Sequence, residues 1–576
     1  RWQGARVPGR LVSSAKSWLC HPGVDRSAAI LPWGAPPEVQ KLSPVEASAV
    51  LLGHLTQAWN SAHPAAPLQD QEVVITVPAS FDEVARALTV TAARQAGLEK
   101  FTLLEEPQAA FYDFISRHRS CLATALDEVR LVLVVDVGGG TSDFTLVQVG
   151  VSPEGPIMRR IAVGEHLMLG GDNMDAALAR KAEERLVSAG RRLTAVQWSQ
   201  LVQAARVAKE ALLNEEEQGS NRPPGPPRSE AGQGGAAHFT ISIASEGSRL
   251  VGGAISTQVT RSEAEAIVLD GFLPACHPMD VPQRGARVAL QELGLPYAQD
   301  PAITRHLAHF LRAHAVAGFT GLGEQRPGDA LPRPDALLLN GGVFNSAKMT
   351  QRLVEVLSSW WPEKPPLRLL HHESLDLAVA RGAAYYGLAR RGLGRRIGGG
   401  TAHAIYVGLE AGDQATRSLC LVPRGQEEGE IIELPNRVFQ LAVGEPVRFP
   451  LFSTTADRLE RPGDLAPVSD EFTELPPIHT LLQTAAKTKG RVPVHLQARL
   501  TEIGTLELWC VSESGRERWR LEFELRGAAN EKNVTVTESM PAGFAEARLW
   551  VERIFGKSHL GAPAGQTRAQ PPKDVK

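Results

Sequence analysis

The chain has few cysteines, no long apolar run and no excess of charge of either sign. Its 5 cysteines are scattered along 576 residues and form no Cys-x-x-Cys pair. A disulfide framework or a zinc module is therefore not expected, and a reducing cytoplasm fits this composition. No apolar stretch of about 18 residues occurs, so we predict no membrane-spanning segment and no membrane partner.

Charge excludes a further class of partner. Lysine and arginine number 61 and aspartate and glutamate 64, which gives a net charge of −3. No global basic field exists to gather phosphates, so nucleic acid is not expected as a partner. A bound nucleotide would need a local site.

Two common phosphate-binding motifs are missing. No G-x-x-x-x-G-K-[ST] sequence occurs, which excludes a P-loop, and Gly138 to Thr141 does not follow G-x-G-x-x-G, which disfavours a dinucleotide-binding Rossmann unit. The length is enough for roughly three or four domains of about 150 residues.

Strand and helix patterns alternate through the first 390 residues. Val73–Val77 is a β-branched run typical of a buried strand, a helix is predicted through Arg94, and a strand follows at Phe101–Leu104. Leu131–Val135 and Leu337–Leu339 are the other clear strands. This order predicts an α/β sheet with right-handed crossovers.

Composition changes at two places. Residues 215–237 form a Pro, Gly and polar tract that cannot bury enough apolar area to order itself, so we expect a disordered surface insert. Residues 392–400 (GLGRRIGGG) are predicted to form a flexible linker. Short alternating strands are predicted beyond it, which indicates an antiparallel sandwich-like module; they lie at 404–407, 418–422, 430–434, 494–500, 506–511 and 518–525.

The most informative segment ends the strand Leu131–Val135. Asp136 follows it, and then Gly138, Gly139, Gly140 and Thr141. Three glycines let backbone amides approach an anion, and an acid at a strand end can hold magnesium through water. A plain glycine-rich turn of an α/β fold remains the alternative.

A second strand-turn of the same kind lies about two hundred residues later. Leu337–Leu339 leads into Asn340, Gly341 and Gly342, and a helix is predicted at Ser346–Ser358. Paired strand-turns far apart in sequence are typical of the actin-like fold, which holds a nucleotide in a cleft between two lobes.

Six segments in one order resemble the heat-shock 70 kDa chaperone family. They are VVITVPASF (73–81), EEPQAAF (105–111), VVDVGGGTSDF (134–144), LGGDNMD (169–175), LNGGVFNSAKM (339–349) and LDLAVARGAA (375–384). The resemblance covers most of residues 11–390. It implies an actin-like (ribonuclease H-like), two-lobed ATPase domain followed by a β-sandwich that resembles a substrate-binding domain.

The resemblance also implies domain limits. We expect a nucleotide-binding domain at 1–391, a linker at 392–403, the β-sandwich at 404–527 and a further segment or disordered tail at 528–576. The family's first phosphate loop is not found in this chain, so the chain is expected to begin after it. The family's acidic and hydrophobic interdomain linker is also replaced.

Site residues follow from the matched motifs. Lys16, Glu106 and Asp136 take the positions of the catalytic groups, and Asp136 would hold magnesium through water. The remaining matched positions imply nucleotide contacts: Gly138, Gly139, Gly140, Thr141, Gly170, Gly171, Arg206, Lys209, Leu213, Gly341, Gly342, Asn345 and Asp376. Arg206, Leu213 and Asn345 depart from the residues usual in the family, so weaker or altered nucleotide affinity is expected.

The implied function is ATP-dependent chaperone activity in the stress response. ATP/ADP and Mg²⁺ would be the cofactors, and the partners would be unfolded or extended peptides, co-chaperones and a nucleotide-exchange factor. Two alternatives stay open. One is a non-hydrolysing, nucleotide-sensing scaffold of the same fold, and the other is an actin-superfamily small-molecule kinase, against which the β-rich module argues.

Overall fold

The computed structural model describes residues 10–521, with gaps. The longer gaps are 188–192, 214–237, 245–253, 284–294, 411–414, 482–489 and 502–504, and the others are one or two residues long. The insert predicted at 215–237 and the segment predicted at 528–576 therefore lie outside the described residues. All described residues belong to one compact unit within Arg1–Ala528.

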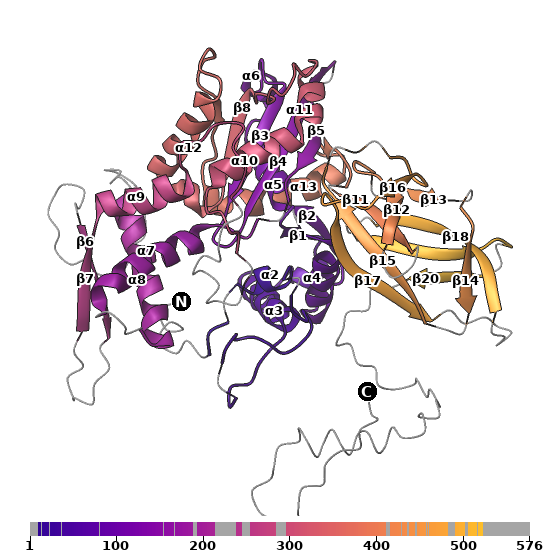
Figure 1. The fold of residues 1–576 in the computed structure, drawn as a ribbon, viewed down its shortest axis with the longest axis horizontal. Helices are drawn as coiled ribbons and strands as arrows, with labels where there is room; N and C mark the ends of the chain where they lie inside the picture. Colours follow the sequence, from indigo (N-terminus) through magenta and orange to yellow (C-terminus); the bar gives the residue numbers. More distant parts are fainter. Residues whose placement is uncertain are drawn as a thin grey trace, which may run out of the picture. The chain divides into compact units, whose positions relative to one another are not determined.

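A mixed six-stranded sheet forms the centre of this unit (Figure 1). Its strands in spatial order are β10 (Ile397–Gly398), β5 (Gly155–Val163), β4 (Ser142–Ser152), β3 (Leu131–Val137), β8 (Ala336–Asn340) and β9 (Arg368–Leu370). β3, β4 and β5 are antiparallel neighbours, whereas β8 runs parallel to β3 and β9 parallel to β8.

Strand β3 is buried on both faces, as its apolar run predicts. Leu131, Leu133 and Val135 join one hydrophobic core, and Val132 and Val134 join the other. Helices cover both faces (Figure 1). On the Val132 face lie α5 (Glu106–Arg117), α6 (Leu122–Ala125) and α13 (Leu375–Arg390).

The hydrophobic core on the Leu131 face continues into a longer series of elements, not all of which touch the sheet (Figure 1). They are α7 (Gly171–Leu186), α8 (Ala195–Leu213), β6 (His238–Ala244), β7 (Ala254–Thr260), α9 (Arg261–Phe272), α10 (Ile303–Ala313), α11 (Ala315–Leu322), η4 (Gly342–Asn345) and α12 (Ala347–Ser359). The helix predicted at Ser346–Ser358 is therefore confirmed to within one residue.

A smaller parallel sheet pairs β1 (Val73–Val77) with β2 (Phe101–Glu105). It packs with α4 (Glu83–Gln95), and α2 (Ala15–Trp18), α3 (Pro44–Ala62) and η2 (Leu68–Asp70) precede it in the chain. The strand predicted at Val73–Val77 is confirmed. It is only half-buried along most of its length, however, rather than buried on both faces.

Two antiparallel sheets follow in the chain and share one hydrophobic core. The first contains β16 (Leu465–Pro467), β12 (Ala415–Val422), β11 (Ala404–Glu410), β15 (Pro446–Thr454) and β17 (Thr473–Leu481). The second contains β13 (Ile431–Glu433), β14 (Phe439–Val443), β18 (Gly490–Leu500), β19 (Leu506–Ser512) and β20 (Arg518–Leu521). We call residues 404–521 the β module. Sequence patterns missed β14, β15, β16 and β17.

The segment predicted as a linker, residues 392–400, pairs with the central sheet over part of its length. Ile397 and Gly398 form β10, which extends the central sheet beside Met158 and Arg159 of β5. The Tyr112 hydroxyl accepts a hydrogen bond of 2.8 Å from the Ile397 amide. Gly399 and Gly400 have φ of +133° and +53°, backbone conformations that favour glycine.

Candidate functional site

The two glycine-containing turns begin side by side. Parallel pairing of β3 and β8 sets Asp136 opposite Asn340, although 204 positions separate them in the chain. The Asn340 amide donates a 2.8 Å hydrogen bond to the Asp136 carboxylate, and both side chains are buried. The register of one strand pair therefore brings the predicted phosphate turns to the same edge of the sheet.

The turn after β3 packs against the start of α7. The amides of Gly171 and Asp172 donate to the carbonyls of Gly138 and Gly139 at 3.0 and 2.7 Å. A Cβ atom on Gly170 would lie only 2.7 Å from both carbonyl oxygens, so glycine is required there. Among the described residues, the amides of Gly139, Gly140 and Thr141 take no part in the turn's backbone bonds and remain available to an anion.

The turn after β8 uses its two glycines differently. Gly341 has φ of +91°, and a Cβ atom there would lie 2.2 Å from the Val137 carbonyl oxygen. A Cβ atom on Gly342 would meet nothing within 4 Å. The Val343 side chain comes within 3.5 Å of the Cβ position of Gly171, where the turn after β3 also packs. The two turns thus converge on Gly171.

A lysine and a glutamate form an ion pair beside Asp136 in this site. Lys16 on α2 donates a 2.5 Å hydrogen bond to Glu106, the first residue of α5. Desolvation lowers the pKa of Lys16, but Glu106, Asp143 and Asp136 outweigh it and raise the pKa above its ordinary value. Lys16 therefore stays a cation beside three carboxylates.

Asp136 is the most perturbed acid of the site. Burial, followed by repulsion from Glu106 and Asp143, raises its pKa to about 7, against the opposing effects of the Asn340 hydrogen bond and Lys16. A buried carboxylate of this kind gains from a bound cation, because the cation compensates for the lost hydration.

Lys209 lies in the site but is already paired. Its Nζ atom lies 2.6 Å from Asp175 Oδ1 and donates to the Gly171 carbonyl at 3.2 Å. Burial raises the pKa of Asp175 to about 6, and Lys209 partly counteracts this. The lysine thus ties α8 to the first turn of α7.

The other predicted nucleoside contacts fall into two groups. Ser346 at the start of α12 donates a 2.9 Å bond to the Leu213 carbonyl, and Asn345 donates a 3.1 Å bond to Asp376 at the start of α13. These residues mark where α8, α12 and α13 approach the second turn. Arg206 instead pairs with Glu210 on its own helix, 3.0 Å away.

Sequence reasoning missed several residues here. Asn340 is the hydrogen-bond donor to Asp136, and its place at the equivalent strand end was a usable signal. Ser17 Oγ lies 3.1 Å from the Cβ position of Gly140. The Asp172 carboxylate lies 3.4 Å from the position that a Cβ atom on Gly139 would take. Burial raises the pKa of Asp172. Nothing in the local sequence pointed to Ser17.

These residues fit a polyphosphate and a hydrated cation. Unused amides lie in the turn after β3, Gly342 opens to free space, and a buried acid stands between the two turns. No group of three metal-ligating side chains occurs among the described residues, so direct protein ligation by several side chains is not seen in that part. Mg²⁺ commonly keeps several waters, which suits one carboxylate.

Comparison with known proteins agrees with this arrangement. Residues 34–221 match the family model described as Hsp70 protein. The chain is 34% identical over 227 residues to the chaperone protein HscA homolog of Bordetella pertussis, covering 37% of this chain and 33% of that protein. It is 37% identical over 176 residues to the chaperone protein HscA homolog of Paracidovorax citrulli, and this match covers 30% of this chain and 25% of that protein.

The Hsp70 domain implies an actin-like ATPase fold, and the mixed sheet with helices on both faces fits that class. Over residues 34–221, the chain is similar to the Hsp70 family. It spans about a third or less of the length of the curated relatives it matches. Within the described ranges, no helix has the length and apolar character needed to cross a membrane.

Proposed function

We propose that this chain carries the nucleotide site and the peptide-binding module of an Hsp70-type chaperone, in which ATP hydrolysis controls the binding of unfolded peptide. The observation that carries the proposal is the Lys16–Glu106 pair, 2.5 Å apart, beside buried Asp136 and two converging glycine turns. Cation, carboxylates and open amides are the groups that phosphoryl transfer to water requires.

Each residue has a distinct role in this proposal. The free amides of Gly139, Gly140 and Thr141 bind the phosphates, with the Gly342 turn opposite them. Lys16 stabilises negative charge on the terminal phosphate, and Glu106 orients the attacking water. Bound Mg²⁺ would supply charge neutralisation, and Asp136 would hold its water shell once deprotonated.

The same proposal extends to the whole molecule. We assign the nucleotide-binding domain to 1–391, the β-sandwich to 404–527 and a further segment or a disordered tail to 528–576. Residues 392–403 join the two domains as an ordered segment. We further propose ATP/ADP with Mg²⁺ as cofactors, extended peptides and co-chaperones as partners, and the cytoplasm as the location. The comparisons favour neither the non-hydrolysing scaffold nor the small-molecule kinase.

Calorimetric titration with ADP and Mg²⁺ tests the site first. Binding by the wild type, weakened at least about tenfold in Asp136→Asn, is expected because the acid anchors the hydrated cation. Phosphate release by the natural full-length protein, with and without unfolded peptide, then tests hydrolysis. Release stimulated by peptide supports the chaperone, whereas binding without any release contradicts the hydrolytic role.

A further inference from the structure

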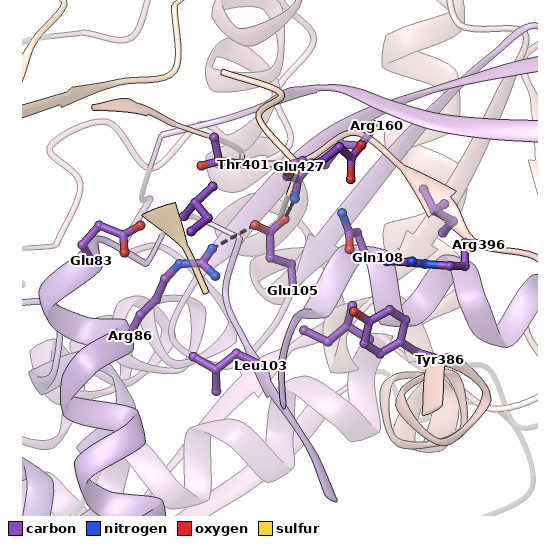
Figure 2. Close-up of a pocket in the computed structure, with 14 residues that line it drawn as sticks. Glu83, Arg86, Leu103, Glu105, Gln108, Arg160, Tyr386, Arg396, Thr401 and Glu427 are labelled. Carbon is purple, nitrogen blue, oxygen red and sulfur yellow. Dashed lines mark hydrogen bonds and ion pairs between the residues drawn. The ribbon is translucent and has the colours of Figure 1, made fainter. Parts of the chain in front are cut away.

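Two consecutive glutamates, the last residue of β2 and the first residue of α5, lie in different surroundings. Glu106 pairs with Lys16 in the proposed nucleotide site. Glu105 instead lies in the cavity of Figure 2, between α4, β5 and the segment that leads into the β module. This cavity, about 70 Å³, is far smaller than a nucleotide pocket, so it is not a second nucleotide site.

Both oxygens of Glu105 are held by arginines (Figure 2). Arg86 of α4 donates a 2.8 Å hydrogen bond to Oε1, and Arg160 of β5 donates to Oε2. All three side chains are less than a tenth exposed. Glu105 is therefore the carboxylate that bonds to both arginines, although buried Glu83 also lies near Arg86 in the same cavity. Removal of the Glu105 charge leaves two buried cations with less compensation.

Arg160 also reaches the backbone beyond β10. Its second terminal nitrogen donates to the Gly400 carbonyl. A Cβ atom on Gly399 would lie 2.6 Å from the Arg160 carbonyl oxygen, so the backbone here is tightly fitted. Thr401 in turn exchanges backbone hydrogen bonds with the turn Gly425–Gln426 of the β module. A single side chain thus links Glu105 to the entrance of the β module.

We propose that Glu105 is a positioning residue that fixes the end of β2, and hence the direction of Glu106, through the position of residues 399–401. This inference rests on the proposed function and deepens it. Glu105 and Glu106 share one peptide unit, so a shift of the strand end moves both. Catalytic groups misplaced by about 1 Å lose on the order of a hundredfold in rate.

The test compares Glu105→Gln with a matched control in the natural full-length protein. Glu105→Gln keeps the shape but removes the counter-charge of Arg86 and Arg160. Glu83→Gln removes the charge of an equally buried carboxylate of the same cavity, which lies near Arg86 and accepts a 3.0 Å bond from the Leu506 amide of the β module. It therefore controls for loss of a cavity charge while Glu105 and its bonds to both arginines are kept. We expect kcat for ATP hydrolysis to fall at least about tenfold in Glu105→Gln, with KM within about twofold, and no such fall in Glu83→Gln.

A second readout does not depend on turnover. Amide hydrogen exchange of residues 397–401 is expected to rise about tenfold in Glu105→Gln and in Arg160→Lys. Arg160→Lys removes the guanidinium that bonds to Gly400, and Glu105→Gln removes the charge that holds this guanidinium in place. Glu83→Gln should leave it unchanged. Arg160→Lys retains a charge beside Glu105, so it serves if Glu105→Gln does not fold.

The outcomes separate this inference from the proposed function. Absence of turnover in the wild type contradicts the proposed function, whereas hydrogen exchange still decides whether Glu105 holds residues 399–401. Wild-type turnover with unchanged kcat and exchange in both variants overturns the inference. A rise in KM alone also overturns it, because it indicates lost binding rather than misplaced Glu106.

Discussion

The ammonium of Lys16 lies 2.5 Å from the carboxylate of Glu106, although ninety positions separate them in the chain. Lys16 comes from the short helix α2, and Glu106 is the first residue of α5, where Pro107 fits the helix start. The pair acts electrostatically on Asp136 at the end of β3: Glu106 raises the pKa of that acid and Lys16 lowers it. We therefore expect substitutions in this charge cluster to change activity more than stability.

Replacement of Lys16 tests that distinction. Lys16→Met should reduce phosphate release on the order of a hundredfold, because charge on the terminal phosphate loses its stabilising cation. The free energy of unfolding should change by less than about 1 kcal/mol, since 48% of the lysine side chain is exposed. Lys181→Met breaks a comparable pair with Glu184 on α7, 2.8 Å apart, and should keep full activity. Equal losses in both variants would contradict the role of Lys16.

Asp136 should make stability depend on pH in a defined direction. Its pKa rises from the ordinary value of 3.8 to about 7 in the folded protein. Between these values the folded state binds more protons than the unfolded state, so stability falls as pH increases. Urea unfolding at pH 5 and pH 7.5 should show a smaller loss in Asp136→Asn than in the wild type. Identical losses would mean that Asp136 is not the titrating group.

The same titration bears on the cation. Above about pH 7, Asp136 is ionised and can hold a hydrated cation, whereas at pH 5 it is protonated in most molecules. Nucleotide binding with Mg²⁺ should therefore strengthen from pH 5 to pH 8 in the wild type. Calorimetry on Asp136→Asn should show a flatter dependence, and an equally steep one would contradict this assignment.

The two glycines after β8 offer a matched pair of variants. Gly341→Ala should destabilise the fold by more than about 2 kcal/mol, because its Cβ would overlap the Val137 carbonyl at a φ of +91°. Gly342→Ala should leave the melting temperature nearly unchanged, because its Cβ enters free space. It should nevertheless weaken ADP binding if phosphate occupies that space. Unchanged affinity in Gly342→Ala would place the phosphate elsewhere.

The attachment of β10 can be tested at Tyr112. Its buried hydroxyl accepts a 2.8 Å bond from the Ile397 amide, so Tyr112→Phe leaves a buried donor without a partner. A loss of about 1–3 kcal/mol in the free energy of unfolding is expected. Hydrogen exchange at Ile397 should accelerate in the variant. Unchanged exchange would indicate that the pairing of β10 with β5 suffices to protect this amide.

Local sequence patterns predicted the elements around the candidate site well. The strands at 73–77, 131–135 and 337–339 were recognisable because β-branched and aliphatic runs of this length suit a buried strand. The β module was harder to predict. Pro450 lies within β15, and the register with β17 shifts between Phe449 and Leu451. Proline at such a bulge interrupts the alternation that marks a strand.

The structure of residues 392–400, predicted as a linker, was also hard to predict from the sequence, for a different reason. Its glycines predicted flexibility, because composition alone carries no information about which surface a segment contacts. In the structure, Arg160 and Gln426 fit closely around Gly399 and Gly400. Glycine here permits positive φ and close approach.

The sequence by itself determined the two glycine-containing turns, since the backbone freedom that they need is a property of the residues at those positions. Tertiary structure alone decided which distant groups meet: Asp136 with Asn340, Lys16 with Glu106, and Glu105 with Arg160. Such pairings depend on strand register and helix packing across long stretches of chain. Two adjacent glutamates of equal chemistry therefore acquired different surroundings, one beside the glycine turns and the other among buried arginines.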